Sequence, residues 1–222
     1  MVSRQDIRYH ASGRMGTSNV IRTVGVKWGV VTAISDVLKG VLAVWAVRWS
    51  FGERIDWMFA CAGMLAVLGH IKSAFLVETK PNGRIRFRGG AGGLTSLGVV
   101  VGIWSPIIFF AGLPALILYL TLGYASVATF SINLFATLAF ILMRLFGFEP
   151  CSWWYVLYGI FGLFIVFYAL RPNLKRLRAG TERVMKFSLN AALRRKAEQS
   201  EIRRRRPHSK SSKKTKTRAK SN

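Results

Sequence analysis

The sequence predicts an all-α, polytopic integral membrane protein with about six transmembrane helices, some of them short, Gly-rich cytoplasmic loops and a basic C-terminal tail. Three observations predict this class. The chain has 222 residues, of which 51% are hydrophobic, and its mean hydropathy is +0.30. Its formal net charge is nevertheless +24. Residues 94–143 contain no Asp, Glu, Lys or Arg, and this run is far longer than the ~20 residues that a helix needs to cross a bilayer.

The first two spans follow from apolar runs. One is expected at residues 26–49, where Asp36 and Lys39 lie three residues apart on one helical face. They form either a structural ion pair, which is the favoured alternative, or a wall of the site. A second span is expected at about residues 57–77. It carries His70 near its end, either as a packing residue or as a member of a site beside the basic loop that follows.

The remaining spans follow from charge and parity. The loop at residues 78–93 and the tail are both strongly basic, so both are expected on the cytoplasmic side with an even number of crossings between them. Residues 153–170 form one span, and residues 94–147 suit three short ones, with breaks at residues 105–106 and 123–126. The total is six crossings with both termini in the cytoplasm.

The positive charge is concentrated at the C-terminus. Residues 171–222 hold 19 basic and 3 acidic residues, a net of +16, whereas residues 1–170 hold 14 basic and 6 acidic residues, a net of +8. The sequence therefore predicts a membrane domain over residues 1–186 and a polybasic, disordered cytoplasmic tail over residues 187–222. Such a tail is expected to bind anionic lipid. Nucleic acid is the alternative partner, disfavoured because no aromatic residue follows Phe187 to stack on bases.

Motifs of several enzyme classes are absent from the sequence. It has no His-Glu-x-x-His, no Cys/His cluster, no Walker loop and no Gly-x-Ser-x-Gly, so metal-dependent hydrolysis, nucleotide hydrolysis and a Ser-His-Asp triad find no support. Neither a metal nor a cofactor is expected. Cys61 and Cys151 are expected to be unpaired thiols, and residues 1–10 lack the apolar core of a signal peptide.

A basic, Gly-rich segment at residues 84–96 is the strongest candidate site. It combines three arginines, four glycines and two hydroxyls between two apolar segments. Glycine amides can turn inward together, and a helix beginning near Leu94 would add its positive dipole end, so the segment suits an anion. The alternative is a flexible loop whose arginines follow the positive-inside bias. The Gly/Ser-rich run at residues 11–19 is a second candidate phosphate loop.

Several segments match a known family in order and spacing. They are Asp6-Ile7-Arg8 with Ser12, Gly13, Gly16, Asn19 and Arg22, residues 36–40, Gly69-His70, Phe87-Arg88-Gly89-Gly90 with Gly92 and Thr95, Tyr124-Ala125-Ser126, and residues 173–182. Over about residues 5–187 the chain resembles the bacterial acyl-phosphate:glycerol-3-phosphate acyltransferases.

The resemblance implies a multi-pass enzyme of the bacterial inner (cytoplasmic) membrane with its site on the cytoplasmic side. The implied reaction moves a fatty acyl group from acyl phosphate to the 1-hydroxyl of glycerol 3-phosphate and gives lysophosphatidic acid for phospholipid biosynthesis. Because acyl phosphate is already activated, positioning and oxyanion stabilisation suffice without a covalent nucleophile. The family implies seven spans, and the additional one would precede the loop at residues 11–19.

Carried over residue by residue, the resemblance implies three catalytic residues and a larger binding set. The catalytic residues are Ser12, Arg22 and His70. The substrate and phosphate ligands are Gly13, Arg14, Gly16, Asn19, Arg88, Gly89, Gly90, Gly92, Thr95, Ser126 and Asn173. Ser12 has the alternative role of a turn or helix cap.

The chain departs from the family's pattern at four positions. Ala91 replaces a lysine, Leu170 a histidine and Gly123 an arginine, whereas Arg14 stands where the family has asparagine. Two functions are therefore weighed. One is an active acyltransferase in which Arg14 and Arg88 supply the missing charge, and the other is a catalytically weak or inactive paralogue that binds lipid phosphate as an accessory membrane protein. A small transporter is a third alternative, and the Gly-rich loops argue against it.

Overall fold

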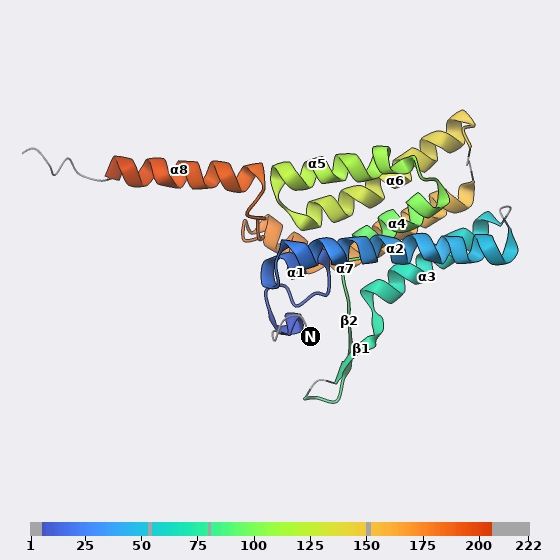
Figure 1. Cartoon of the computed structure of the whole chain (residues 1–222), viewed down its shortest axis with the longest axis horizontal. Helices are drawn as coiled ribbons and strands as arrows, with labels where there is room; N and C mark the ends of the chain where they lie inside the picture. Colours follow the sequence, from blue (N-terminus) through green and yellow to red (C-terminus); the bar gives the residue numbers. More distant parts are fainter. Residues whose placement is uncertain (1–5, 53–54, 80, 150–151, 206–222) are drawn as a thin grey trace, which may run out of the picture.

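Helices form most of the chain, and they follow the apolar runs of the sequence (Figure 1). The computed structural model describes residues 6–52, 55–79, 81–149 and 152–205. The elements are, in order, η1 (Ile7–Tyr9), α1 (Thr17–Thr23), α2 (Val26–Phe51), α3 (Asp56–Ile71), β1 (Ser73–Thr79), β2 (Ile85–Arg88), α4 (Gly93–Ile103), η2 (Ile108–Gly112), α5 (Leu113–Leu122), α6 (Ala125–Phe146), α7 (Trp153–Arg178) and α8 (Leu189–Arg205). η1 is a 3-10 helix and η2 is a π-helix.

The apolar helices lie where the sequence predicts spans. α2, α6 and α7 are long and apolar enough to cross a membrane, and α3, α4 and Ile108–Leu122 are shorter apolar helices. Both predicted breaks are confirmed, because the chain leaves the helical conformation around Ser105 and again at Gly123, whose φ is 77°. The chain is an integral membrane protein, and six crossings stays a prediction.

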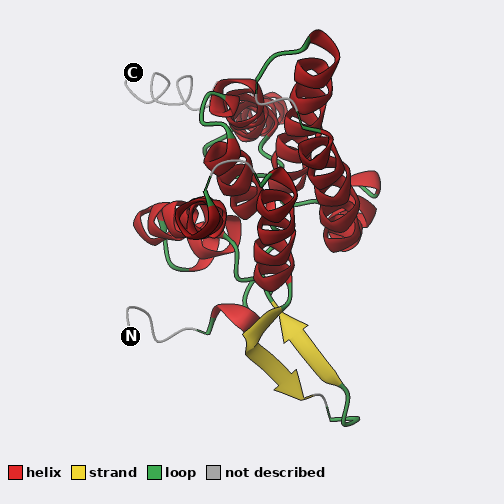
Figure 2. Cartoon of the chain, turned by 90° about the vertical axis from the view of Figure 1, so that its right-hand side faces the viewer, coloured by secondary structure: helices red, strands yellow, loops and turns green. Residues whose placement is uncertain are grey.

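The second predicted span is wrong at its C-terminal end. α3 ends at Ile71, and β1 then pairs antiparallel with β2 to form a hairpin (Figure 2). A helix continued to residue 77 would bring Glu78 to the edge of the hydrocarbon, whereas the strand pairs Glu78 with Arg86 across the hairpin. The fold is therefore helical apart from this one hairpin among the described residues, and the predicted loop at 78–93 contains half of it.

The polybasic tail, which the sequence predicts to be disordered, includes a helix at residues 189–205. The segment forms α8 because it is rich in Ala, Leu and Arg and contains neither Gly nor Pro. Asn190 Nδ2 donates to Leu122 O at 3.0 Å, and Arg194 Nη2 donates to Tyr124 OH at 3.0 Å. α8 then runs away from the end of the bundle in roughly the direction of α2 (Figure 1). The domain boundary near residue 186 stays a prediction.

The bundle core forms where small residues let helices touch. α2 packs against α4 so closely that a Cβ added at Gly98 would lie 2.0 Å from Val37 O, and one at Gly40 would lie 2.1 Å from Thr95 O. Small residues at such contacts are typical of packing between helices in membranes. The buried apolar core around this contact includes Val44, Phe59, Val67, Val99, Phe140 and Tyr158.

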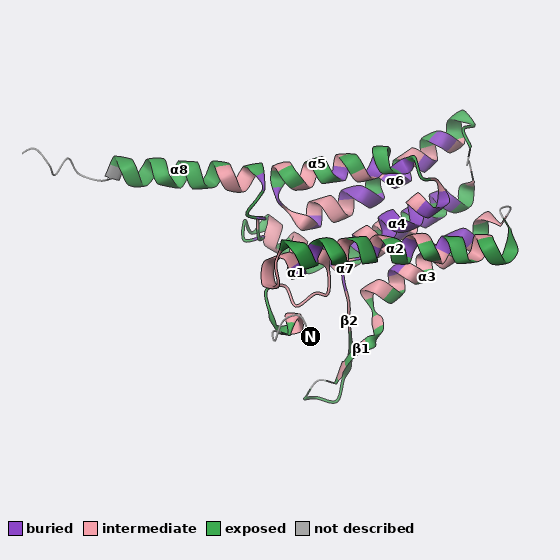
Figure 3. Cartoon of the chain, in the orientation of Figure 1, coloured by how far each residue is buried: buried purple, intermediate pink, exposed green. Residues whose placement is uncertain are grey.

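The outer faces of the bundle are also apolar. Much of the surface of α2 and α5 is exposed (Figure 3), and large hydrophobic side chains are exposed on several helices, among them Ile34, Leu42, Leu116, Leu138 and Phe164. A helix that is apolar on all sides is typical of a membrane span. These outer side chains are therefore the lipid-facing surface of the bundle.

Candidate active site

A cavity of about 610 Å³ joins most of the predicted site residues. It lies between the N-terminal loop, α1, α2 at Asp36, the end of α3, the start of α4, η2, α5, α6 and the segment from α7 to residue 182. Its polar lining includes Ser12, Arg14, Thr17, Ser18, Asn19, Arg22, Asp36, His70, Tyr119, Ser126, Thr129, Asn173 and Glu182. Its apolar lining includes Leu94, Leu97, Ile108, Phe109, Leu113, Leu116, Ile132 and Leu170.

Two arginines give the cavity its positive charge. Arg14 Nη2 donates to Ala169 O, and Arg22 Nη2 donates to Arg183 O at 3.1 Å. Neither forms an ion pair with a carboxylate of the described residues. Burial lowers the pKa of both guanidinium groups below the ordinary value, but arginine stays charged at neutral pH. Both therefore keep positive charge in the cavity for an anion.

Asn19 organises the loop that carries Ser12 and Arg14. Its Nδ2 donates to Ile7 O at 3.1 Å and to Arg14 O at 2.8 Å, and its Oδ1 accepts from Ser12 N at 3.2 Å. Asn19 is buried, and both its amide nitrogen and its oxygen are occupied by backbone. Asn19 also lines the cavity. Its hydrogen bonds to the backbone show that it shapes the loop, and its predicted role as a substrate ligand stays a prediction. Ser12 Oγ accepts from Arg14 N at 3.4 Å, which is the turn-capping alternative.

His70 lies beside an acidic partner at the end of α3. His70 Nδ1 is 3.5 Å from Asp36 Oδ1, and Lys39 Nζ donates to the same oxygen at 3.0 Å. The predicted Asp36–Lys39 pair therefore exists, and Asp36 also lines the cavity. Asp36 therefore forms the structural ion pair with Lys39 and is also part of the wall of the cavity.

Gly89 and Gly90 pack against α3 and do not line the cavity. A Cβ added at Gly90 would lie 2.0 Å from His70 Nε2, and one added at Gly89 would lie 2.2 Å from His70 O. Gly90 N also donates to His70 O at 3.0 Å. These two glycines therefore allow the chain after β2 to pass close to His70. Of the predicted glycine ligands, only Gly16 and Gly92 lie in the cavity lining.

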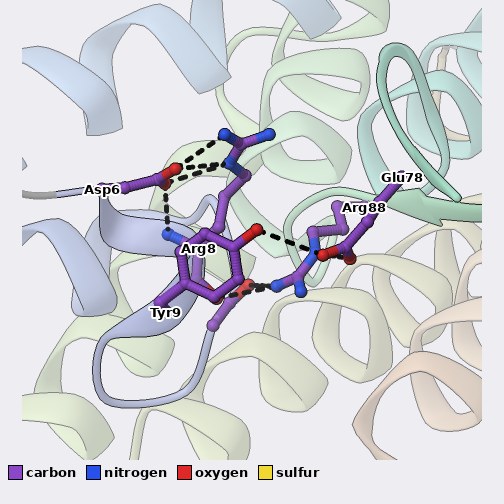
Figure 4. Close-up of polar contacts among 6 residues, drawn as sticks. Asp6, Arg8, Tyr9, Glu78 and Arg88 are labelled. Atoms are coloured by element: carbon purple, nitrogen blue, oxygen red, sulfur yellow. Dashed lines mark hydrogen bonds and ion pairs between the residues drawn. The ribbon is translucent and has the colours of Figure 1, made fainter. Parts of the chain in front are cut away.

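Arg88 lies outside the cavity lining, where it ties β2 to the N-terminal loop (Figure 4). Its Nε donates to Glu78 Oε2 at 2.6 Å, and its Nη1 donates to Arg8 O at 2.7 Å. Its guanidinium also stacks over the Tyr9 ring at 5.4 Å from the centroid. The structure therefore does not bring Arg88 together with Arg14, Arg22 and the other predicted ligands.

The segment after α7 brings a carboxylate that the sequence did not single out. Asn173 Nδ2 donates to Glu182 Oε1 at 2.8 Å, and Arg176 Nε donates to Glu182 Oε2 at 3.1 Å. Glu182 is buried and lines the cavity. A single acidic residue in a strongly basic segment was the signal available for finding it.

Several buried polar atoms in the cavity wall have no hydrogen-bond partner among the described residues. They are Thr17 Oγ1, Ser126 Oγ and Asn173 Oδ1. Thr95 Oγ1 is also buried without a hydrogen-bond partner among the described residues, but Thr95 does not line the cavity. Buried polar atoms are nearly always satisfied in folded proteins. Three such atoms around one cavity indicate that a polar ligand or water completes it.

The departures from the family pattern fall at or near the same place. Ala91 and Leu170 line the cavity and contribute no charge. Gly123 has a φ of 77°, and a Cβ there would lie 2.3 Å from Ser188 Oγ. An arginine at position 123 would therefore need both a strained backbone and a displaced Ser188.

Known proteins share this chain's sequence and fold. A family model described as glycerol-3-phosphate acyltransferase matches residues 1–180. The glycerol-3-phosphate acyltransferase of Alkaliphilus metalliredigens is 36% identical over 185 residues, covering 82% of this chain and 84% of the relative. That of a Thermus thermophilus strain is 37% identical over 186 residues, covering 80% of this chain and 81% of the relative.

Solved structures agree with the sequence relatives. A crystal structure of PlsY (YgiH), an integral membrane glycerol 3-phosphate acyltransferase, in its glycerol 3-phosphate form is similar with a TM-score of 0.67 and 31% identity over 82% of this chain and 83% of that chain. The lysophosphatidic acid form of PlsY has a TM-score of 0.65 and 30% identity. The chain, with its membrane helices and its cationic cavity, therefore belongs to the glycerol-3-phosphate acyltransferase family.

Proposed function

We propose that this protein transfers a fatty acyl group from acyl phosphate to the 1-hydroxyl of glycerol 3-phosphate. The alcohol oxygen attacks the acyl carbonyl carbon, the bond from that carbon to the phosphate oxygen breaks, and the alcohol proton is removed as inorganic phosphate leaves. The product is lysophosphatidic acid. The two similar PlsY structures are named for glycerol 3-phosphate and lysophosphatidic acid, which are the proposed acceptor and product.

One observation carries the proposal: a single cavity has a cationic part and an apolar part. Arg14 and Arg22 lie among the polar residues that line it, and Leu97, Phe109 and Leu116 lie among the apolar ones. Both proposed substrates carry phosphate, and the donor also carries a long apolar chain. A cavity that offers charged donors beside an apolar wall suits both substrates.

The charged donors compensate for the lysine that Ala91 replaces. Arg14 and Arg22 spend hydrogen bonds on backbone carbonyls, and a guanidinium has five N–H donors in all. Each therefore retains donors for a phosphate oxygen. Thr17 Oγ1 and Ser126 Oγ, which lack partners among the described residues, would add neutral hydrogen bonds.

His70 is proposed to remove the alcohol proton. It lines the cavity and lies 3.5 Å from Asp36, and a neighbouring carboxylate stabilises an imidazole that has gained a proton. Ser12 and Arg22 are proposed to hold the donor during attack. Because the donor is an activated anhydride, these residues need only position it and stabilise the developing oxyanion.

We test the reaction with the full chain in liposomes, supplied with acyl phosphate and labelled glycerol 3-phosphate. Labelled lysophosphatidic acid and free phosphate are expected in equal amounts. Acyl-CoA and acyl carrier protein thioesters are expected to give no product when they replace acyl phosphate. A well-inserted protein without turnover would favour the inactive, lipid-phosphate-binding paralogue instead.

We also propose that the protein lies in the bacterial cytoplasmic membrane with both termini in the cytoplasm. The basic loop, the hairpin arginines and the tail support this orientation through the positive-inside bias. A reporter enzyme that is active only in the cytoplasm is expected to be active when it is fused after Asn222. Activity of an externally working reporter at the same position would contradict the orientation.

A further inference from the structure

The β1–β2 hairpin has an exposed apolar face that the acyltransferase reaction does not explain. Val77 lies opposite Phe87 across the strands, and Thr79 lies opposite Ile85, so Val77, Ile85 and Phe87 share one face. Their exposed fractions are 46%, 65% and 49%. Phe75, in the irregular part of β1, is 97% exposed. In water these aromatic and branched side chains would form an unfavourable surface.

The other face of the hairpin is charged. Glu78 lies opposite Arg86 across the strands. Glu78 Oε2 accepts from Arg88 Nε at 2.6 Å. Arg84, next to the turn, and Arg86 are exposed. The hairpin is therefore amphipathic, with apolar side chains on one face and mainly positive charge on the other face and near the turn.

The length of α3 places the base of the hairpin at membrane level. α3 has 16 residues, which at 1.5 Å each make a helix of about 24 Å, shorter than the ~30 Å thickness of the hydrocarbon layer. Only Lys72 separates its end from β1. The hairpin therefore begins before the chain has left the boundary between hydrocarbon and head groups.

The direction of the hairpin agrees with that depth. In both views it projects away from the bundle (Figures 1 and 2), and in Figure 1 it runs across the direction of α2. An element at the boundary that runs across the spans lies along the membrane plane. Its unpaired strand edges require water or head groups, which excludes the hydrocarbon centre.

We propose that the β1–β2 hairpin lies in the lipid interface, with Phe75, Val77, Ile85 and Phe87 inserted among the upper acyl chains. Arg84 and Arg86 then point to anionic head groups. The apolar face with positive charge beside it matches the chemistry of interfacial amphipathic elements.

The proposal gives the hairpin a part in holding the site at the membrane surface. Arg88, at the end of β2, donates to Arg8 O and Gly13 O at 2.7 and 3.5 Å. Gly13 lies between Ser12 and Arg14, both of which line the cavity. A hairpin held in the lipid interface therefore fixes the position, along the membrane normal, of the loop that carries Ser12 and Arg14.

The test uses spin labels on adjacent residues of opposite faces. In a full chain with Cys61→Ala and Cys151→Ala, a label is placed at Ile85→Cys or at Arg86→Cys, and a third at Phe75→Cys. Each protein is reconstituted into vesicles of phosphatidylcholine and phosphatidylglycerol. Collision rates with oxygen, which concentrates in lipid, and with a water-soluble nickel complex are then measured. We expect labels at 85 and 75 to favour oxygen at least roughly fivefold over the label at 86.

Three outcomes would overturn the proposal. Equal nickel access at 85 and 86 would place both faces in water. Protection at 85 that persists in detergent without lipid would mean that protein covers the face. Protection that falls when the protein is diluted in excess lipid would mean that a second copy covers it. None of these measurements depends on acyl transfer, so the hairpin proposal and the proposed reaction stand or fall separately.

Discussion

Arg14 and Arg88 both stand beside glycines in basic loops, and the structure gives them different partners. Arg14 points to the cavity and bonds to a backbone carbonyl, whereas Arg88 bonds to Glu78 and to Arg8 O. Position in a loop does not separate these roles, because both loops contain Gly, Ser and Arg and both arginines are next to a glycine. The carboxylate partner separates them, and that partner is set by the strand pairing.

Substitution of Arg14 and of Arg88 by alanine should therefore lower activity for different reasons. Arg14→Ala is expected to lower kcat/KM roughly 100-fold, about 2.7 kcal/mol of transition-state stabilisation, without changing thermal stability. Arg88→Ala is expected to lower activity through a loosened N-terminal loop and so to increase protease cleavage near residues 8–13. Ala91→Lys should change activity little. Full activity of Arg14→Ala in the liposome assay would remove Arg14 from the phosphate site.

The Glu78–Arg88 pair predicts a pH dependence of the hairpin. The hydrogen bond from Arg88 lowers the pKa of Glu78 below its ordinary value of 4.5. A carboxylate whose folded pKa is depressed stabilises the fold above the unfolded pKa, and this stabilisation is lost as pH falls through the lower folded value. The protection factors of the β1 and β2 amides, which compare measured hydrogen exchange with the intrinsic rate at the same pH, should therefore fall below about pH 4.5. Glu78→Gln should already exchange faster at neutral pH and show a weaker dependence.

At the scale of elements, the contact between α2 and α4 should be the most sensitive to added volume. A Cβ at Gly98 would lie 2.0 Å from the backbone oxygen of Val37, and backbone cannot move aside as a flexible side chain can. Gly98→Ala is expected to cost on the order of 1–3 kcal/mol and to lower the unfolding temperature in detergent. Gly69→Ala is the matched control, because no atom lies within 4 Å of its added Cβ. Equal unfolding temperatures would show that the helices separate freely.

The helices and their breaks could be predicted because each depends on residues that are consecutive in the sequence. The uncharged run, Ser105 and Gly123 give the spans and their ends directly. The hairpin was missed because Ala74 to Val77 continues the apolar character of α3, and only the pairing of Glu78 with Arg86 distinguishes strand from span. Part of the site could be predicted from motif residues, but Glu182 depends on contacts between distant segments.

At the scale of the whole molecule, the tail should be separable from the bundle. α8 contacts the α5–α6 corner through Asn190 and Arg194 and then leaves the bundle. Truncation after Lys186 is expected to leave insertion and acyl transfer nearly unchanged and to weaken binding to vesicles rich in anionic lipid. Solubilised protein binding to anionic and neutral vesicles measures the second effect. Loss of turnover in a well-inserted truncated protein would make α8 part of the site.

The cavity joins the beginning of the chain to its end, and this sets when the enzyme becomes complete during synthesis. Ser12 and Arg22 leave the ribosome before α2, whereas Asn173 lies near the end of α7 and Glu182 follows that helix. A nascent chain that ends after α6 holds most of its membrane helices but lacks one wall of the site. Two co-expressed fragments divided between α6 and α7 would each be inert, and turnover would depend on their meeting within the bilayer.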